Sequence, residues 1–132
     1  MNVLVVARLY PWPPVDGYRQ RLVNMIGALS TLGDVEVFSP PPEAGGTGAP
    51  PEEAGVARVV TAPVADLRPR DWMRSWLRSD EPRRIASVDW SEARRELAAR
   101  DPRPDLVWYS LLDTWVAFGD LLAGIPSIVD FD

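Results

Sequence analysis

The residues best suited to chemistry stand directly after the apolar runs of the chain. The first run, residues 2–7, leads into a proline-rich loop over residues 8–17 that ends at Gly17. A helix that starts there turns backbone N–H groups and the positive end of its dipole towards the loop, and such an end binds phosphates. Arg19 lies in the first helical turn, where a cation opposes the dipole. We therefore expect Arg19 to contact an anion, and the neighbouring Arg21 to lie in solvent.

Carboxylates and a serine follow the later apolar runs. Asp130 and Asp132 end the last run, and Ser110 and Asp113 come just after the run 104–109. A carboxylate in such a place could orient a hydroxyl of a bound ligand or accept its proton. Structural roles compete with this interpretation, because an aspartate after a strand often caps the next helix. For Asp113 the cap is the favoured role.

The apolar runs predict the elements that position these residues. The first expected strand, residues 2–7, is a continuous apolar segment, as in a parallel sheet covered on both faces. The other expected strands are residues 34–38, 56–62, 104–109 and 125–131. Helical segments alternate with them, which favours right-handed crossovers. We predict an α/β, Rossmann-like three-layer sandwich with a mainly parallel sheet of strand order about 3-2-1-4-5. The carboxyl ends of its strands meet at one edge, where such folds bind ligands.

Helix boundaries are predicted from capping residues. Asp16 or Gly17 starts the first helix, and Gly33 is expected to end it in a left-handed conformation. Its apolar stripe comprises Leu22, Ile26 and Leu29, widened by Met25 and Leu32. Asp89 and Glu92 have capping-box spacing for a later helix.

Composition excludes several classes of chemistry. The chain has 132 residues, 46% of them hydrophobic, and a net charge of -5, which argues against a general nucleic-acid binder. It has no cysteine, histidine or lysine. Disulfides, a Ser-His-Asp triad and a P-loop lysine are therefore impossible within it. No apolar run is long enough to span a membrane and no signal peptide is evident, so we expect a cytoplasmic protein.

Two middle segments have distinct compositions. Residues 40–55 are almost entirely Pro, Gly, Ala and Glu, and predict a flexible loop. Residues 69–84 combine tryptophans with arginines, and Trp72, Met73, Trp76 and Leu77 share one helical face. That face could touch a membrane surface or a lipid-linked acceptor. The alternative, which we favour here, is a lid helix packed over the sheet with its arginines in solvent.

The segment NVLVVARLYPWPPVDGYRQRLVNMIGALSTLGDVEVFSP resembles the start of a GT-B glycosyltransferase of the family 4 type. The matching features are a short apolar strand, a Pro-Pro-x-x-Gly loop, an arginine and a Leu-x-x-x-Leu helix. PDLVWYS and GIPSIVDFD fit later strands of the same domain. The resemblance implies that residues 1–132 are the N-terminal, acceptor-side domain of a longer enzyme. The C-terminal domain, which binds the nucleotide-diphosphate sugar, would be absent from this chain.

The resemblance also implies roles for particular residues. Gly17, Tyr18 and Arg19 would bind the donor phosphates, although many relatives have a second glycine where Tyr18 stands. The acceptor would contact Ser110, Asp113 and Asp130. Relatives often have a histidine at the strand end that Asp132 occupies, which makes Asp132 the candidate catalytic residue.

The expected function is therefore sugar transfer from a nucleotide-diphosphate donor to an acceptor hydroxyl, with this chain inactive alone. The resemblance implies neither metal nor cofactor, because helix ends and basic side chains neutralise the leaving diphosphate. The expected partners are nucleotide sugar and acceptor, with no nucleic acid and an open question of peripheral membrane contact. A non-catalytic flavodoxin-like binding domain is the alternative. A phosphoreceiver is disfavoured because Arg8 follows the first strand and lysine is missing, and a dinucleotide enzyme because G-x-G-x-x-G is missing.

Overall fold

A computed structural model describes residues 1–44 and 49–131, and its centre is a parallel sheet. The five strands lie in the order β3-β2-β1-β6-β7. Their bounds are Asn2–Val6 (β1), Asp34–Ser39 (β2), Val56–Thr61 (β3), Leu106–Tyr109 (β6) and Ser127–Val129 (β7). The predicted fold class is confirmed. The numbering differs from 3-2-1-4-5 because two unpredicted strands of two residues each intervene, β4 (Ala65–Asp66) and β5 (Val88–Asp89), which pair antiparallel in a separate small sheet.

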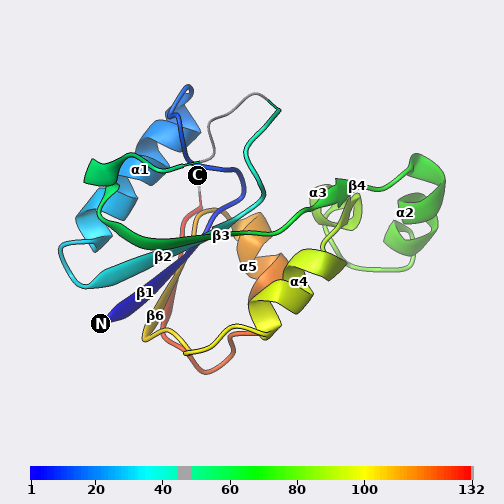
Figure 1. Cartoon of the computed structure of the whole chain (residues 1–132). Coiled ribbons are helices and arrows are strands. Elements are labelled where there is room, and N and C mark those ends of the chain that lie inside the picture. Colours follow the sequence, from blue (N-terminus) through cyan, green and yellow to red (C-terminus); the bar gives the residue numbers. More distant parts are fainter. Residues whose placement is uncertain (45–48, 132) are drawn as a thin grey trace.

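Helices cover both faces of the sheet. Figure 1 shows α1 on one side and α4 with α5 on the other, which gives three layers. The helices are α1 (Gly17–Leu29), α2 (Pro69–Trp76), α3 (Arg83–Ala86), α4 (Ser91–Ala98) and α5 (Leu112–Phe118), and a short 3-10 turn, η1, spans Glu52–Ala54. The turn η1 lies inside the segment predicted as a loop, and residues 45–48 of that segment are outside the described part. In the part that is described, no helix has the length and apolar character needed to cross a bilayer.

Two hydrophobic cores lie on the two sides of β1. Leu4 and Val6 pack with α4 and α5, whereas Val3 and Val5 pack with α1. Successive strand residues point to opposite faces, so an unbroken apolar strand supplies both cores. In the first core, Phe118 makes edge-to-face contacts with Phe38 and Trp90, at ring-centroid distances of 5.8 and 5.5 Å. Because a core covers each of its faces, the first strand shows no polar alternation.

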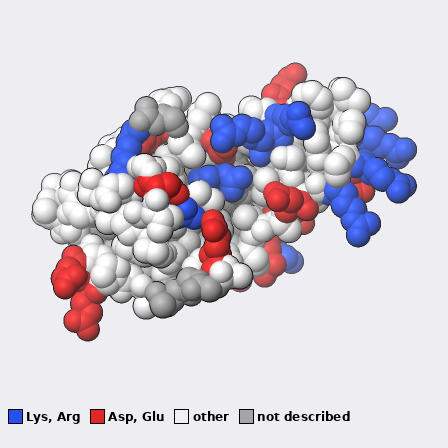
Figure 2. Space-filling view, turned by 90° about the horizontal axis from the view of Figure 1, so that it is seen from above, with Lys and Arg blue, Asp and Glu red and all other residues white. Residues whose placement is uncertain are grey.

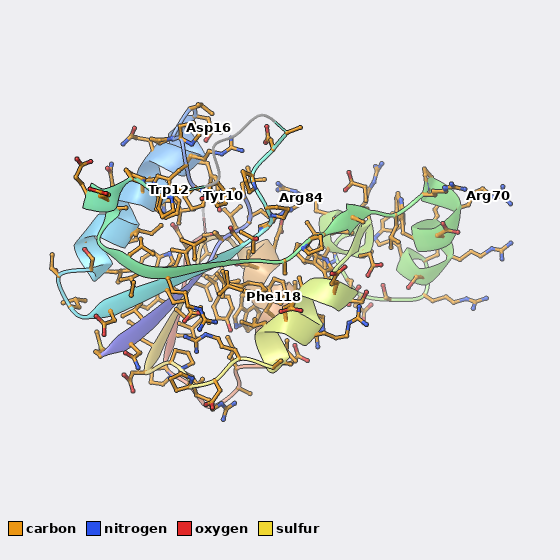
Figure 3. All side chains as sticks on the ribbon, viewed as in Figure 1. Tyr10, Trp12, Asp16, Arg70, Arg84 and Phe118 are labelled. Carbon is orange, nitrogen blue, oxygen red and sulfur yellow. The ribbon has the colours of Figure 1, made fainter. Side chains whose placement is uncertain are left out.

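Aromatic side chains anchor the proline-rich loop. Tyr10 and Trp12 are buried in the α1-side core, and their rings meet edge to face at 5.8 Å. Figure 3 shows them beneath the start of α1, close to Asp16. Asp16 caps the helix as expected, since its Oδ1 accepts the Arg19 N–H at 2.8 Å. The loop thus fixes where α1 begins.

The other helix boundaries differ partly from the predictions. Leu22, Ile26 and Leu29 are buried as expected, but α1 ends at Leu29 and Leu32 is exposed. The prediction for Gly33 was wrong, since it lacks a positive φ. Glycine is needed there for space instead, because a Cβ atom would lie 2.0 Å from the Met1 carbonyl oxygen.

Two aspartates that were predicted to cap helices do not hold the N-cap positions. Asp89 lies outside α4, although its Oδ1 accepts the Ser91 N–H at 3.0 Å. The prediction that Asp113 caps its helix was wrong, because Leu111 holds the N-cap position and Asp113 lies within the first turn of α5. The chain turns into this helix earlier than the capping pattern indicates, because Ser110 and Leu111 already leave the sheet.

The helix α2 does not cover the sheet. Figure 1 shows it at the far end of the molecule, next to α3 and the small sheet. Its principal partner is α3, and Arg83 of α3 stacks over the buried Trp72 ring at 5.3 Å. The favoured interpretation of this segment as a lid was therefore wrong, since Trp72 is buried locally beneath Arg83 of α3 and not against the sheet.

Candidate functional site

A pocket of about 250 Å³ opens at the carboxyl edge of the sheet. It lies between the first turns of α1 and the ends of β6 and β7. Its lining residues are Gly17, Tyr18, Arg21, Leu22, Met25, Trp108, Ser110, Leu111 and Asp130. The chain leaves β1 towards α1 on one face and leaves the adjacent β6 towards α5 on the other. This divergence is the topological switch point where open α/β sheets bind ligands.

Two hydroxyl groups form the polar floor of the pocket. The Tyr18 hydroxyl and Ser110 Oγ are 2.7 Å apart. The backbone N–H of Arg8 donates to both, at 3.0 Å to Tyr18 and 3.1 Å to Ser110. The residue that follows β1 therefore fixes two side chains from elements far apart in the sequence. Within this network one hydroxyl donates to the other, and the accepting hydroxyl keeps its own hydrogen for a ligand.

Tyr18 remains a neutral phenol in this setting. Burial raises its pKa above the usual value, and this outweighs the hydrogen bonds from Ser110 and from the Arg8 backbone, which lower it. A neutral phenol can donate a hydrogen bond, whereas a phenolate cannot. Tyr18 therefore contributes a side-chain hydrogen-bond donor to this pocket.

An ion pair stands at the rim of the pocket. The Arg21 guanidinium binds the Asp130 carboxylate directly. The Asp130 side chain is 16% exposed and that of Arg21 is 41% exposed. Arg21 was expected to be a solvated surface residue, and that expectation was wrong. The pair offers a ligand both a cationic donor and a carboxylate acceptor.

Arg19 points away from this pocket. Its side chain is only 12% exposed and pairs with both Asp16 and Glu43. Its Nε also donates to the Tyr10 carbonyl at 3.0 Å. Two carboxylates already neutralise this cation, so it does not project from the helix start towards a ligand in the pocket.

Asp113 also lies outside the pocket lining. Its Oδ2 is 4.0 Å from Arg8 Nε and 3.8 Å from Arg84 Nε. The Arg8 guanidinium in turn lies over the Trp90 ring, 5.2 Å from its centroid. Asp113 therefore belongs to a charged cluster on the α5 side of the sheet edge, and Figure 3 shows Arg84 there, away from the loop beneath α1.

The structure thus brings together Gly17, Tyr18, Ser110 and Asp130 among the predicted site residues. Gly17 is not required by space, because a Cβ atom would meet nothing within 4 Å. Asp132 lies outside the described residues.

Sequence reasoning missed Arg21 and the apolar wall formed by Trp108 and Met25. A signal for Trp108 was present, because strand alternation puts it on the face opposite its buried neighbours Val107 and Tyr109. Trp108 pairs in register with Val5, which belongs to the α1-side core.

Among the described residues, no group of three or more acidic side chains is arranged to hold a metal ion. Comparisons with protein-family models, with curated proteins and with solved structures found no match.

Proposed function

We propose that the chain is the acceptor-side, Rossmann-like domain of a sugar-nucleotide-dependent glycosyltransferase, and that the pocket at the switch point binds a sugar ring of the acceptor. The observation that carries this proposal is the combination of an apolar wall with a polar floor and rim in one small pocket. Trp108, Leu22 and Met25 form the wall, and Ser110 with Asp130 supplies polar atoms. A sugar ring has the matching character, since it presents C–H groups on its faces and hydroxyls at its edge.

Each polar group has a distinct task in this proposal. Asp130 accepts a hydrogen bond from an acceptor hydroxyl, and Arg21 holds the Asp130 carboxylate in place. The hydroxyl pair of Tyr18 and Ser110 donates its remaining hydrogen to a second oxygen of the sugar. Held at two oxygens, the acceptor presents one orientation, which is what positional catalysis requires.

The size of the pocket limits the ligand. At about 250 Å³ it is smaller than the 300–1,000 Å³ typical of drug-sized ligands, so it fits a single ring rather than a whole nucleotide sugar. The donor would bind to a second domain that faces this edge. Gly17 and Tyr18 would then lie where the bound acceptor meets the donor phosphates.

The binding half of the proposal is tested by NMR titration of the 132-residue chain with hexoses, N-acetylhexosamines and nucleoside diphosphates. We expect a sugar to shift the Trp108 indole signal and the amides of Ser110 and Asp130. The Asp130→Asn variant should bind the sugar at least about tenfold more weakly, because it loses a charge-assisted hydrogen bond. Asp34→Asn, the same change at an exposed site on the opposite sheet edge, is the matched control.

The transfer half is tested on the longest polypeptide that the gene encodes, with radiolabelled nucleotide sugars as donors. Loss of transfer in Asp130→Asn but not in Asp34→Asn supports the assignment. Sugars that leave the pocket signals unmoved at millimolar concentration, or that bind Asp130→Asn and wild type equally, would contradict it. A partner protein that shifts the same signals instead would favour the non-catalytic binding domain.

A further inference from the structure

The segment formed by residues 68–84, called the α2 segment below, has a charge opposite to that of the rest of the protein. It contains six arginines and three acidic residues, whereas the whole chain carries a net charge of -5. Because α2 does not cover the sheet, packing against the sheet does not explain this concentration of arginine. Figure 2 shows basic side chains gathered at the end of the molecule that α2 forms.

The inner face of α2 carries the contacts that attach the helix to the rest of the protein. Trp72 is 8% exposed and contacts Trp76 edge to face at 5.9 Å. Arg83 covers the Trp72 ring from α3. These contacts hold α2 in a fixed orientation, so its outer face is a defined surface.

The outer face combines apolar and cationic side chains. Met73 is 45% exposed and Leu77 is 74% exposed. They are four residues apart and therefore share one side of the helix. Arg70 and Arg74 each precede one of them by three residues, which places them on the same side, and both are exposed. Figure 3 shows Arg70 directed away from the body of the protein.

We infer that this outer face of α2 docks on an anionic bilayer surface. Apolar side chains flanked by arginines are the pattern of helices that lie in the membrane interface. The arginines would contact lipid phosphates while Met73 and Leu77 enter the acyl boundary. The long arginine side chains can reach up to the headgroups as the helix settles. This inference is independent of the proposed transfer reaction.

Nucleic acid fits this face less well. Single-stranded nucleic acid binds through aromatic rings that stack on its bases. The Trp72 ring is buried beneath Arg83, and exposed Met73 and Leu77 have no part in binding phosphates. A second copy of the chain fits poorly as well, because a symmetric contact would bring two arginine-rich faces together.

Vesicle co-sedimentation tests the inference with the 132-residue chain. The probes are vesicles of phosphatidylcholine alone and of phosphatidylcholine mixed with phosphatidylglycerol. We expect binding to the anionic vesicles only. Each arginine near such a surface contributes about fivefold, so Arg70→Gln/Arg74→Gln should weaken binding by about 30-fold at low salt. High salt should remove most of that difference, since salt screens exposed charges.

Two further variants separate docking from general charge attraction. Arg95→Gln/Arg103→Gln removes the same charge from exposed positions outside the α2 segment and should bind as wild type does. Leu77→Ser should weaken binding at low and at high salt alike, because its contribution is apolar. Circular dichroism confirms that each variant is folded.

Three outcomes would overturn the inference. They are no binding of wild type to anionic vesicles, an equal loss in the two double-arginine variants, and no effect of Leu77→Ser. Binding to a single-stranded oligonucleotide that depends on Arg70 and Arg74, without binding to vesicles, would assign the face to nucleic acid instead.

Discussion

A buried ion pair between α4 and the sheet provides the sharpest test of the energetics. The Arg100 side chain is 7% exposed, and its guanidinium donates to both carboxylate oxygens of Glu36, at 3.0 and 2.8 Å. Glu36 lies in β2, and its side chain is 15% exposed. Arg100 follows the end of α4, so the pair ties that helix to the sheet.

Arg100→Met removes one partner and leaves the Glu36 carboxylate poorly compensated. Breaking a buried pair in this way typically costs 3–5 kcal/mol. Here Arg58 Nη2 remains 3.6 Å from Glu36, and its own side chain is 55% exposed, so some attraction survives. We therefore expect Arg100→Met to lower the free energy of unfolding by about 2–4 kcal/mol.

Removing both partners should restore most of that loss. In Arg100→Met/Glu36→Leu no uncompensated charge is left between α4 and β2, and apolar replacements of buried pairs are often close to neutral. Urea unfolding followed by the fluorescence of the six tryptophans measures all three proteins. Arg103→Met, at an exposed position nearby, should change stability by less than about 0.5 kcal/mol. A cost of under about 1 kcal/mol for Arg100→Met, or a double variant no more stable than Arg100→Met, would contradict a stabilising role for the pair.

Three further predictions concern single sites. Gly33→Ala should lower the free energy of unfolding in urea by about 1–3 kcal/mol, because its Cβ would overlap the Met1 carbonyl. Gly17→Ala should be neutral or stabilising by up to about 1 kcal/mol. Equal changes in stability in the two variants would contradict the geometry. Removing both hydroxyls, in Tyr18→Phe/Ser110→Ala, should cost more than either single change, since only then does the Arg8 N–H lose both acceptors; a double variant no less stable than the singles would count against the network. Burial raises the pKa of Tyr109 from 10.0 to about 12, and the Asp120 charge adds to this effect. Ionisation therefore favours the unfolded chain, and stability should fall as pH rises from 10 towards 12. Urea titrations should find a smaller fall in Tyr109→Phe.

The parallel sheet and its strand order were predictable because they follow from the continuous apolar character of the first strand and from the alternation of helices with strands. The small sheet was missed, since strands of two residues such as β4 show no periodicity. For Arg19, helical spacing held a usable signal: it precedes the buried Leu22 by three residues and therefore lies towards the core.

Tertiary partners were beyond the reach of the sequence. Glu43 meets Arg19 from the proline-rich segment after β2, and Asp130 meets Arg21 across 109 residues. The hydrogen bond between Tyr18 and Ser110 spans 92 residues. No local pattern indicates such pairs, because they arise only when α1 is packed against segments that follow β2, β6 and β7.

The main chain and the side chain of Arg8 make contacts on opposite faces of the sheet edge. Its main chain holds the hydroxyl pair, and its guanidinium lies on the far side with Trp90 and Asp113. Every amino acid except proline carries the N–H that the hydroxyl pair needs. Substitution at this position can therefore remodel the far side while leaving the floor of the pocket intact, which makes residue 8 a place where the two surfaces can be engineered separately.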